Sequence, residues 1–429
     1  MATFSPSFLH VKEHVDRCLP DDFIFKTCRE IGHRWRKRKL DPACTLHLFL
    51  LQLLAGLALS GLRHAGNIAV TAQAICAAKK RLPLQLFTRL VETALPKDFS
   101  AAATYNGLVT YLVDGTSFLV DDVAKLARKY GKSSNQRGTS RSYPTPKLLT
   151  LMHAGAGYIG KAIILPYRRQ EFTCLSRLFK LIGKGCLLMG DRGLVSFAHL
   201  ALMRAQDIHG CFRLPRGMVV RGRGKGSHRL AKRLGRQDML VTWTAYRRPK
   251  WMSKKRWATI SGQTLQLRQI AFRVCRKGYR THWAWIITTL LDPEQHPARK
   301  LIELYTDRWQ IEVNFRDLKC TLKMSKISAK TVKGVQKEVL AFILLYNLIR
   351  QIMRTAAQQQ DVPPDRIGFK DAMLWLLYSP PGTPLAKLLV NPRRERATQP
   401  RRLKKGRHRF PQLNRSRAEL CKPRCAVKI

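Results

Sequence analysis

Five short apolar runs between residues 105 and 214 constrain the fold of this chain most strongly. Their length and β-branched content predict strands, and the AGAG stretch between the second and third runs predicts a hairpin. Helical patterns at 171–182 and 197–206 separate the later runs. This order predicts a mixed α/β sheet flanked by helices. The predicted strands cover residues 107–113, 148–153, 158–165, 185–190 and 208–214.

Two of the predicted strands lead directly into an aspartate. The run at 107–113 precedes Asp114-Gly115-Thr116, and the run at 185–190 precedes Asp191-Arg192-Gly193. Open α/β sheets hold their functional sites at the carboxyl ends of strands. We therefore expect Asp114 and Asp191 to belong to one site.

A third acidic residue lies in a helical stretch at 301–323. If this stretch is one α-helix, four side chains at offsets 0, +3, +7 and +14 lie within roughly a 60° arc. A single carboxylate between an Arg and a Lys on such a stripe indicates the wall of an active site, although a solvated charged face is the alternative. Nearby Glu303, Asp307 and Asp317 point elsewhere round the helix. The four side chains on the stripe are Tyr305, Arg308, Glu312 and Lys319.

Two aspartates at strand ends and a helical glutamate are the residues that two-metal phosphoryl transfer requires. Carboxylate oxygens are the ligands that Mg²⁺ prefers. Two ions about 4 Å apart stabilise the attacking and leaving oxygens of an in-line displacement. Without cations, three converging carboxylates repel one another.

The charge of the chain indicates a polyanionic partner. Lys and Arg together number 79 against 27 Asp and Glu, a formal net charge of +52. Nucleic acid is the usual partner of such a chain, and an anionic membrane surface or an RNA assembly is the alternative. The 45% of hydrophobic residues excludes a simple basic disordered protein.

An apolar run at 45–62 is close to the length of a bilayer span. His47, Gln52 and Ser60 interrupt it, so a helix buried in a helical domain is the better interpretation. The cysteines are scattered singly, and Cys421 and Cys425 form the closest spacing. With no secretory leader recognised, free thiols in a reducing cytoplasm are expected, without a membrane partner.

These motifs together resemble a known family. The sequences VDGT around Asp114 and GDRG around Asp191, with Tyr305-x2-Arg308-x3-Glu312-x6-Lys319, resemble a DDE transposase of a bacterial insertion sequence. The last pattern is similar to the Tyr-Arg-Glu-Lys signature of the insertion-sequence family four group. The resemblance covers roughly residues 105–325. It implies an RNase H-like core with a β-rich insertion between the second Asp and the Glu.

The resemblance also implies roles for individual residues. Asp114, Asp191 and Glu312 would be the catalytic triad and the ligands of two Mg²⁺ ions, for which Mn²⁺ can substitute. The expected phosphate contacts are Tyr305, Arg308 and Lys319. Two further residues have open alternatives: Arg192 contacts phosphate or starts a helix, and Trp285 stacks on a flipped base or belongs to the core.

The expected organisation follows from composition and from the resemblance. We expect a helical DNA-binding domain first, although a purely structural cap is the alternative, and a basic tail that either contacts nucleic acid or is merely solvated. The expected regions are 1–103 (helical), 104–215 with 297–325 (core), 216–296 (insertion), 326–390 (C-terminal helices) and 391–429 (tail).

The predicted function is cut-and-paste DNA transposition. The enzyme would bind double-stranded DNA at the terminal inverted repeats of its element and catalyse Mg²⁺-dependent strand cleavage and strand transfer. Joining two ends calls for a homodimer, and the expected place is the nucleoid in a bacterial cytoplasm. The alternatives are a catalytically silent repressor and a structure-specific nuclease on the same core.

Overall fold

The computed structural model describes residues 5–36, 38–95, 104–133, 143–222, 224–275 and 281–388. The basic tail predicted at 391–429, with Cys421 and Cys425, lies outside these residues.

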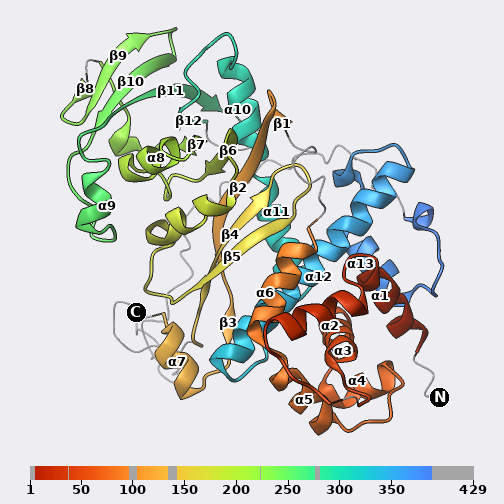
Figure 1. The fold of residues 1–429 in the computed structure, drawn as a ribbon. Coiled ribbons are helices and arrows are strands. Elements are labelled where there is room, and N and C mark those ends of the chain that lie inside the picture. The colour runs from red at the N-terminus through yellow and green to blue at the C-terminus, as the bar shows by residue number, and fades with distance from the viewer. Residues whose placement is uncertain are drawn as a thin grey trace, which may run out of the picture. The chain divides into compact units, whose positions relative to one another are not determined.

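A mixed sheet forms the centre of the fold (Figure 1). β2 (Leu108–Ser117), β4 (Lys147–His153) and β5 (Ile159–Leu165) form an antiparallel meander. β6 (Cys186–Gly190) runs parallel to β2, and β7 (Ile208–Arg213) runs parallel to β6. The spatial order β5-β4-β2-β6-β7 is that of an RNase H-like core, so the predicted fold class is confirmed.

The β-rich insertion continues this sheet beyond β7. β12 (His282–Thr288) pairs antiparallel with β7, which makes the insertion an extension of the core sheet. Trp243 on β10 is completely buried against the same hydrophobic layer as β7. The other strands of the extension follow in the order β11 (Thr264–Val274), β10 (Asp238–Thr244), β9 (His228–Arg233) and β8 (Gly224–Lys225).

The two faces of the sheet pack against different hydrophobic layers. Neighbouring side chains of β2 alternate between them: Leu112 belongs to one cluster and Val113 to the other. The Val113 side is covered by α8 (Phe197–Arg204), and the Leu112 side by the N-terminal helices with α12 (Val332–Gln359). Because each fully buried Leu or Val contributes about 1.5–3 kcal/mol, both layers hold the strands in register.

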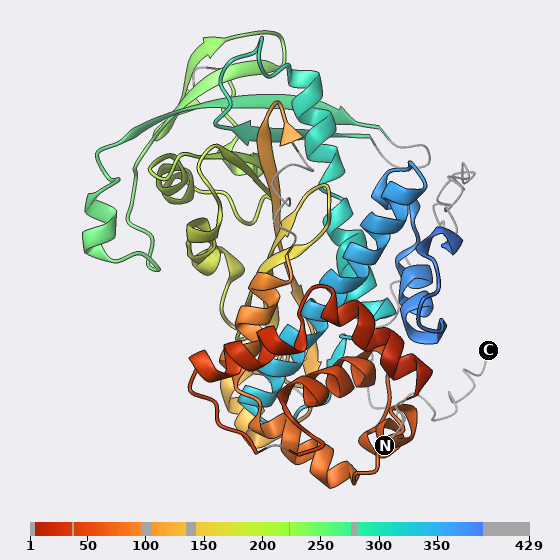
Figure 2. The ribbon, with the colours of Figure 1, turned by 45° about the vertical axis from the view of Figure 1, so that its right-hand side comes forward.

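The N-terminal helices pack around α12 and α13 (Phe369–Tyr378), as the view in Figure 2 shows. The N-terminal helices are α1 (Pro6–Asp16), α2 (Asp21–Glu30), α3 (Pro42–Ala55), α4 (Leu59–Ala65), α5 (Ala72–Arg81) and α6 (Leu84–Thr93).

The apolar run at 45–62 is not one helix. α3 ends at Gly56, whose left-handed φ of 66° favours glycine, and α4 continues at 107° to it. Most of α3 is buried in the helical core, as expected. Among the described residues, α12 is the helix long and apolar enough to span a membrane on its own, and 72% of its apolar window is buried inside the protein.

Candidate active site

The register of β2 and β6 brings the two predicted aspartates together. Their parallel pairing ends at Val113 opposite Gly190, so Asp114 and Asp191 are the next residues on neighbouring strands. The expectation that the strand stops before Asp114 is wrong. β2 continues to Ser117 because β4 still pairs with its other edge, where Asp114 lies opposite Thr150.

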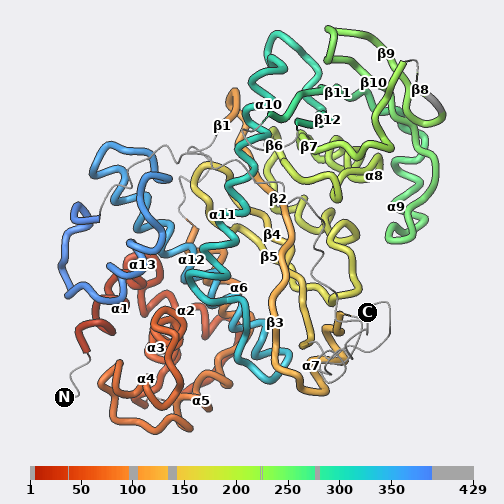
Figure 3. Tube along the Cα trace, turned by 180° about the vertical axis from the view of Figure 1, so that it is seen from behind, coloured from red at the N-terminus to blue at the C-terminus, as the bar shows by residue number. Residues whose placement is uncertain are grey.

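The helical stretch that carries Glu312 is divided into three parts. α10 (Ala298–Asp307) leads into α11 (Gln310–Arg316) beside β2 (Figure 3), and the π-helical turn η5 (Asp317–Thr321) follows. At the junction, the amides of Arg308 and Trp309 donate to carbonyls three residues back, both at 3.2 Å. The predicted continuous helix at 301–323 is therefore wrong, because tight bonding at the junction and the wider π turn change its period.

This division separates the stripe into buried and exposed parts. Tyr305 and Arg308 are each only 6% exposed, whereas the Glu312 side chain is 48% exposed. Lys319 lies half-buried in the π turn. Within the described ranges, Lys319 forms no ion pair with the other site residues. The structure thus joins Tyr305 and Arg308 to the strand ends, and Glu312 to them only through Arg308.

Arg308 connects the helix to the first aspartate. Its Nη1 donates to Asp114 Oδ2 at 3.5 Å, and its Nη2 lies 3.9 Å from Glu312 Oε1. The guanidinium also lies 5.7 Å from the ring of Tyr305. A buried cation needs such acidic partners, because desolvation of an unpaired charge is costly. The guanidinium of Arg308 therefore pairs with the carboxylates of both Asp114 and Glu312.

Asp114 has an unusual electrostatic environment. Burial raises the pKa of its carboxyl to about 6, while the Gly115 amide, at 2.8 Å from Oδ1, and Arg308 oppose the increase. The nearby carboxylates of Asp191 and Glu171 raise the pKa further. Burial is thus the main cause of the raised pKa of Asp114, and each neighbouring carboxylate adds a smaller contribution than Arg308 removes.

The donor set at this strand end fits divalent cations. Asp191 Oδ1 is buried and has no hydrogen-bond partner among the described residues. A buried carboxylate oxygen without a donor is expensive, and a cation bound there would satisfy it. Asp114, Asp191 and Glu312 offer the oxygen ligands that Mg²⁺ and Mn²⁺ accept.

Tyr305 lies within the wall of the site. Its hydroxyl donates to the carbonyl oxygen of Gly190 at 3.5 Å, next to Asp191. Burial raises the pKa of the phenol, so it stays protonated and remains a donor.

The other two predicted site residues lie without contact to the carboxylates in the described structure. Arg192 is exposed immediately after Asp191. Trp285 is half-buried on β12, packed beside the second hydrophobic layer, with the guanidinium of Arg221 5.8 Å from its ring. Their DNA contacts remain predictions.

Sequence reasoning missed Glu171 as a charged neighbour of Asp114, on the face of β2 opposite to the Asp114 side chain. It begins η2 (Glu171–Arg177), a 3-10 turn where an α-helix was expected, and its carboxyl packs against Gly115. A Cβ at Gly115 would lie only 2.5 Å from Glu171 Cδ. The glycine of the Asp-Gly-Thr triplet was thus the one available signal, because only a residue without Cβ leaves room for this carboxyl.

The site and fold agree with the relationship that the sequence comparisons show. The family described as "Transposase DDE domain" matches residues 106–348, more than half of the chain. The chain belongs to this family of DDE transposases. Enzymes of this family transfer phosphoryl groups of DNA with divalent metal ions.

A curated relative shows which type of transposase the chain is similar to. The chain is 24% identical over 269 residues to the transposase InsG for insertion sequence element IS4 of Escherichia coli strain K12. The match covers 62% of this chain and 57% of that relative. It supports the predicted resemblance to this type of insertion-sequence transposase.

A solved structure is also similar, although distantly. It is the cryo-EM structure of the piggyBac transposase synaptic complex with hairpin DNA, with a TM-score of 0.44 and 11% identity. The match covers 85% of this chain and 78% of that chain. A similarity of this size is too weak to define the fold, which is taken from the strand order above.

Proposed function

We propose that this chain is the transposase of an insertion sequence. It binds the terminal inverted repeats of its own element in double-stranded DNA, cleaves the strands and transfers the freed ends to target DNA. The observation that carries the proposal is the convergence of Asp114 and Asp191, through strand register, with the Arg308–Glu312 pair on the helix.

The residues of the site would divide the work of phosphoryl transfer. Asp114, Asp191 and Glu312 would hold two Mg²⁺ ions, or Mn²⁺ in their place. When bound, such ions stabilise the charge on the attacking and leaving oxygens. Tyr305 and the carbonyl of Gly190 fix the wall beside Asp191.

Three side chains are proposed to hold the DNA backbone. Arg308 can exchange its carboxylate partners for a phosphate once cations neutralise Asp114 and Glu312, since guanidinium groups bind both anions well. Tyr305 and Lys319 would contact neighbouring phosphates, because charged and hydroxyl donors are typical of backbone contacts. Arg192 is proposed as a further phosphate contact, and Trp285 as a stacking surface for an unpaired base.

The partners follow from the reaction. Two transposon ends must be joined, so we propose a homodimer in the synaptic complex. The N-terminal helices and the net charge of +52 would supply much of the non-specific DNA affinity. The expected location is the nucleoid of a bacterial cell.

The test uses labelled DNA that carries the inverted repeats flanking the gene. Wild-type protein should cleave at the ends with Mg²⁺ and only bind with Ca²⁺, and Glu312→Gln should bind without cleaving. Glu303→Gln is the matched control, because Glu303 is an exposed glutamate on α10 that pairs with Arg299 at the surface. The control should cleave at the wild-type rate.

Other outcomes would identify the alternatives. Binding without cleavage in Mg²⁺ would indicate a silent repressor and contradict the proposal. Cleavage without preference for the ends would indicate a structure-specific nuclease.

A further inference from the structure

We propose that Arg350 on α12 is a positioning residue for Glu312. The inference rests on the proposed function, because it concerns how the third carboxylate of the candidate centre is held in place. Arg350 belongs to none of the motifs that the sequence indicates, and it comes from a helix outside the matching signature.

The helix that carries Glu312 cannot fix its own orientation. α11 has only seven residues, and it lies between the tight junction at Arg308 and the π turn η5. A helix of this length is marginal without tertiary contacts. The direction in which Glu312 points is therefore set by the side chains that hold the opposite face of α11.

Asn314 lies on that opposite face. It follows Glu312 by two residues, which is about 200° round a helix. Glu312 faces Arg308, whereas Asn314 is 3% exposed and contacts Arg350. The Nη2 group of Arg350 donates to Asn314 Oδ1, and Asn314 Nδ2 donates to the sulfur of Met152 on β4 at 3.8 Å. These bonds fix the rotation of α11 about its axis.

The same guanidinium also holds the start of the π turn. Arg350 Nη2 lies 3.6 Å from Asp317 Oδ2, and neither side chain is more than 12% exposed. The amide of Leu322 donates to the carbonyl of Asp317, five residues back, at 2.9 Å, which is the bond of a π turn. A buried carboxylate needs a partner of opposite charge. Arg350 therefore ties both α11 and the turn that follows it to α12, which lies beside them (Figure 3).

Arg350 is itself held firmly by the core. Its Nε donates to the hydroxyl of Tyr346 at 2.9 Å, and this hydroxyl donates to the carbonyl of Gly157, between β4 and β5, at 3.0 Å. The guanidinium carbon lies 5.3 and 5.7 Å from the ring centres of Tyr346 and Phe369. A Cβ at Gly157 would lie 3.1 Å from this carbon, so the packing is close. Arg350 thus transmits the position of the sheet and of α12 to the helix that carries Glu312.

An arginine is required for these simultaneous contacts. Its planar fork presents several N–H donors in fixed directions, and here they reach Asn314, Asp317 and Tyr346. A lysine keeps the charge beside Asp317, but its single ammonium does not reproduce the fork. Arg350→Lys is therefore the conservative variant, and Arg350→Met removes both charge and fork.

Cleavage of element ends by the full chain tests the inference. Because misplacing a catalytic group by about 1 Å can cost about 10²-fold, Arg350→Met should lower kcat by about that factor. KM for end DNA should stay within about twofold, since the proposed role involves no contact with DNA. Arg350→Lys should recover part of kcat. Lys333→Met, which removes an exposed charge from the same helix, should match wild type in both constants.

Mn²⁺ binding gives a reading that does not depend on turnover. Electron paramagnetic resonance would follow Mn²⁺ titrated into the complex with pre-cleaved end DNA, without target DNA. Arg350→Met should weaken binding about tenfold, in the range typical of residues that orient metal ligands. Adding Glu312→Gln to Arg350→Met should weaken it little further, because Glu312 is already displaced. A purely structural role of Arg350 predicts independent effects of the two substitutions.

Asp317→Asn keeps the test open if Arg350→Met does not fold. It has nearly the same volume as aspartate, removes the ion pair with Arg350 and leaves the fork to Asn314 intact. Its kcat should fall in the same direction as that of Arg350→Met but by less. Thermal unfolding gives the folded fraction of every variant, and kcat is compared per folded molecule.

Two results would overturn the inference while the proposed function stands, which requires that Glu312→Gln binds end DNA without cleaving it. One is wild-type kcat in folded Arg350→Lys and Asp317→Asn together with any folded Arg350→Met. The other is an undiminished effect of Glu312→Gln on Mn²⁺ binding when Arg350 is replaced. Wild-type cleavage by Glu312→Gln would instead refute the proposed function.

Discussion

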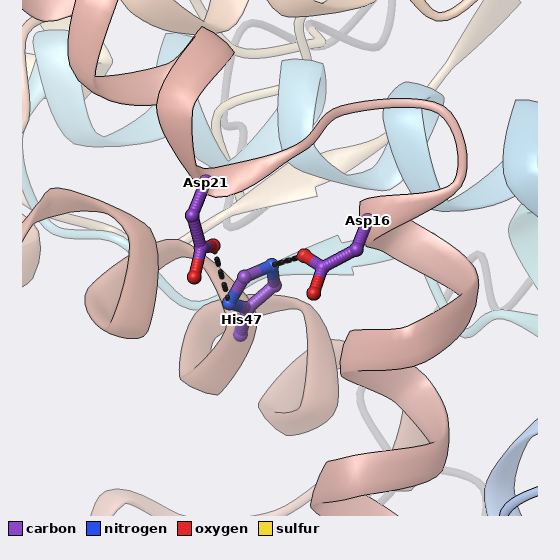
Figure 4. A group of neighbouring side chains, drawn as sticks. All are labelled: Asp16, Asp21 and His47. Carbon is purple, nitrogen blue, oxygen red and sulfur yellow. Dashed lines mark ion pairs between the residues drawn. The ribbon is translucent and has the colours of Figure 1, made fainter.

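Two groups of carboxylates in this chain differ in how their charge is balanced. In the N-terminal helices, Asp16 and Asp21 share Lys12, whose ammonium lies 2.5 and 2.7 Å from them. His47, completely buried, lies between them: Nε2 is 3.4 Å from Asp16 and Nδ1 is 3.9 Å from Asp21 (Figure 4). At the end of β2, by contrast, Arg308 pairs with Asp114 and Glu312, and Asp191 has no ion pair among the described residues.

The difference shows why an acidic cluster is not by itself a metal site. The N-terminal group meets the distance requirement for a cation site, yet Lys12 already occupies the place between the carboxylates. Each ring nitrogen of His47 faces a different carboxylate, which suits a clamp between α1, α2 and α3 better than a shared ion. Positive charge supplied by the protein distinguishes a structural cluster from a binding site.

The pKa values of two aspartates reflect the same difference. Burial alone would raise the pKa of Asp16, but the neighbouring His47 and Lys12 outweigh burial and lower the pKa below 3.8. Burial raises the pKa of Asp114 to about 6, because its single cationic partner and the Gly115 amide are insufficient.

The largest expected effect is at the carboxylates around the end of β2. Asp191→Asn should reduce cleavage of element ends on the order of 10³-fold or more, because losing about 4 kcal/mol of transition-state stabilisation has that effect. Asp16→Asn should leave the cleavage rate within about twofold, since it changes a distant structural pair. Gel-resolved cleavage at equal protein stability is the measurement. Equal loss in both variants would remove the distinction between the clusters.

Arg308→Met is expected to have two opposite effects. Affinity for a DNA end should fall about tenfold, because a charged hydrogen bond to phosphate is lost. Mn²⁺ affinity of the DNA-free protein should rise, because Asp114 and Glu312 lose the guanidinium that neutralises them.

The control for this variant is Lys300→Met, which removes an exposed charge from α10, the helix that ends immediately before Arg308. Fluorescence anisotropy on end DNA and Mn²⁺ titration give the two readings. A similar DNA affinity for Arg308→Met and Lys300→Met would show that Arg308 acts only through net charge.

Lys12→Met tests the N-terminal cluster, in which Lys12 pairs with Asp16 and Asp21 beside His47. Stability should fall by about 1 kcal/mol, a value reduced by the partial exposure of the pair. The variant, unlike wild type, should gain stability from Zn²⁺, because two carboxylates and His47 then lack a cation. Lys26→Met on α2 is the exposed control. Stabilisation of wild type by Zn²⁺ in chemical unfolding would contradict the structural interpretation of this cluster.

The last expected effect is an opposite pH dependence of stability in EDTA. The folded pKa of Asp114 is about 6 against an ordinary 3.8, so the native state binds more protons between these values. The contribution of Asp114 to the free energy of unfolding therefore increases as pH falls from about 6 to 3.8, by at most about 1.4 kcal/mol per pH unit. The pKa of Asp16 is lowered, so its stabilising contribution is lost as pH falls below 3.8.

Unfolding curves from pH 7 to 3 for Asp114→Asn and Asp16→Asn check this contrast. Each variant should remove one of the two trends. Curves that stay parallel to wild type for both variants would show that neither carboxyl has the shifted pKa on which the contrast depends.

Much of the fold and of the candidate site can be predicted from the sequence, because the strongest sequence signals are local. The apolar, β-branched runs defined the strands of the core, and the residues that follow two of them named Asp114 and Asp191. Glu312 was identifiable because Tyr305, Arg308 and Lys319 recur around it at helical spacing. Local hydrophobic pattern and short motifs need no knowledge of distant contacts.

Other features depended on contacts between segments far apart in sequence. Glu171 comes near Asp114 only because the chain folds a 3-10 turn against Gly115, and no periodicity connects these positions. The helix at 301–323 is tightened near Arg308, whose buried guanidinium contacts Asp114, 194 positions away in sequence. It is widened from Asp317, whose carboxylate pairs with Arg350 of α12.

The sequence by itself therefore determined the kind of fold, and it predicted the three carboxylates of the candidate centre. Tertiary structure decided which charges are balanced: Lys12 and His47 complete one acidic cluster, while Arg308 leaves another incomplete. The physical reason is that charge balance depends on distance and burial in space, which only the packed chain sets.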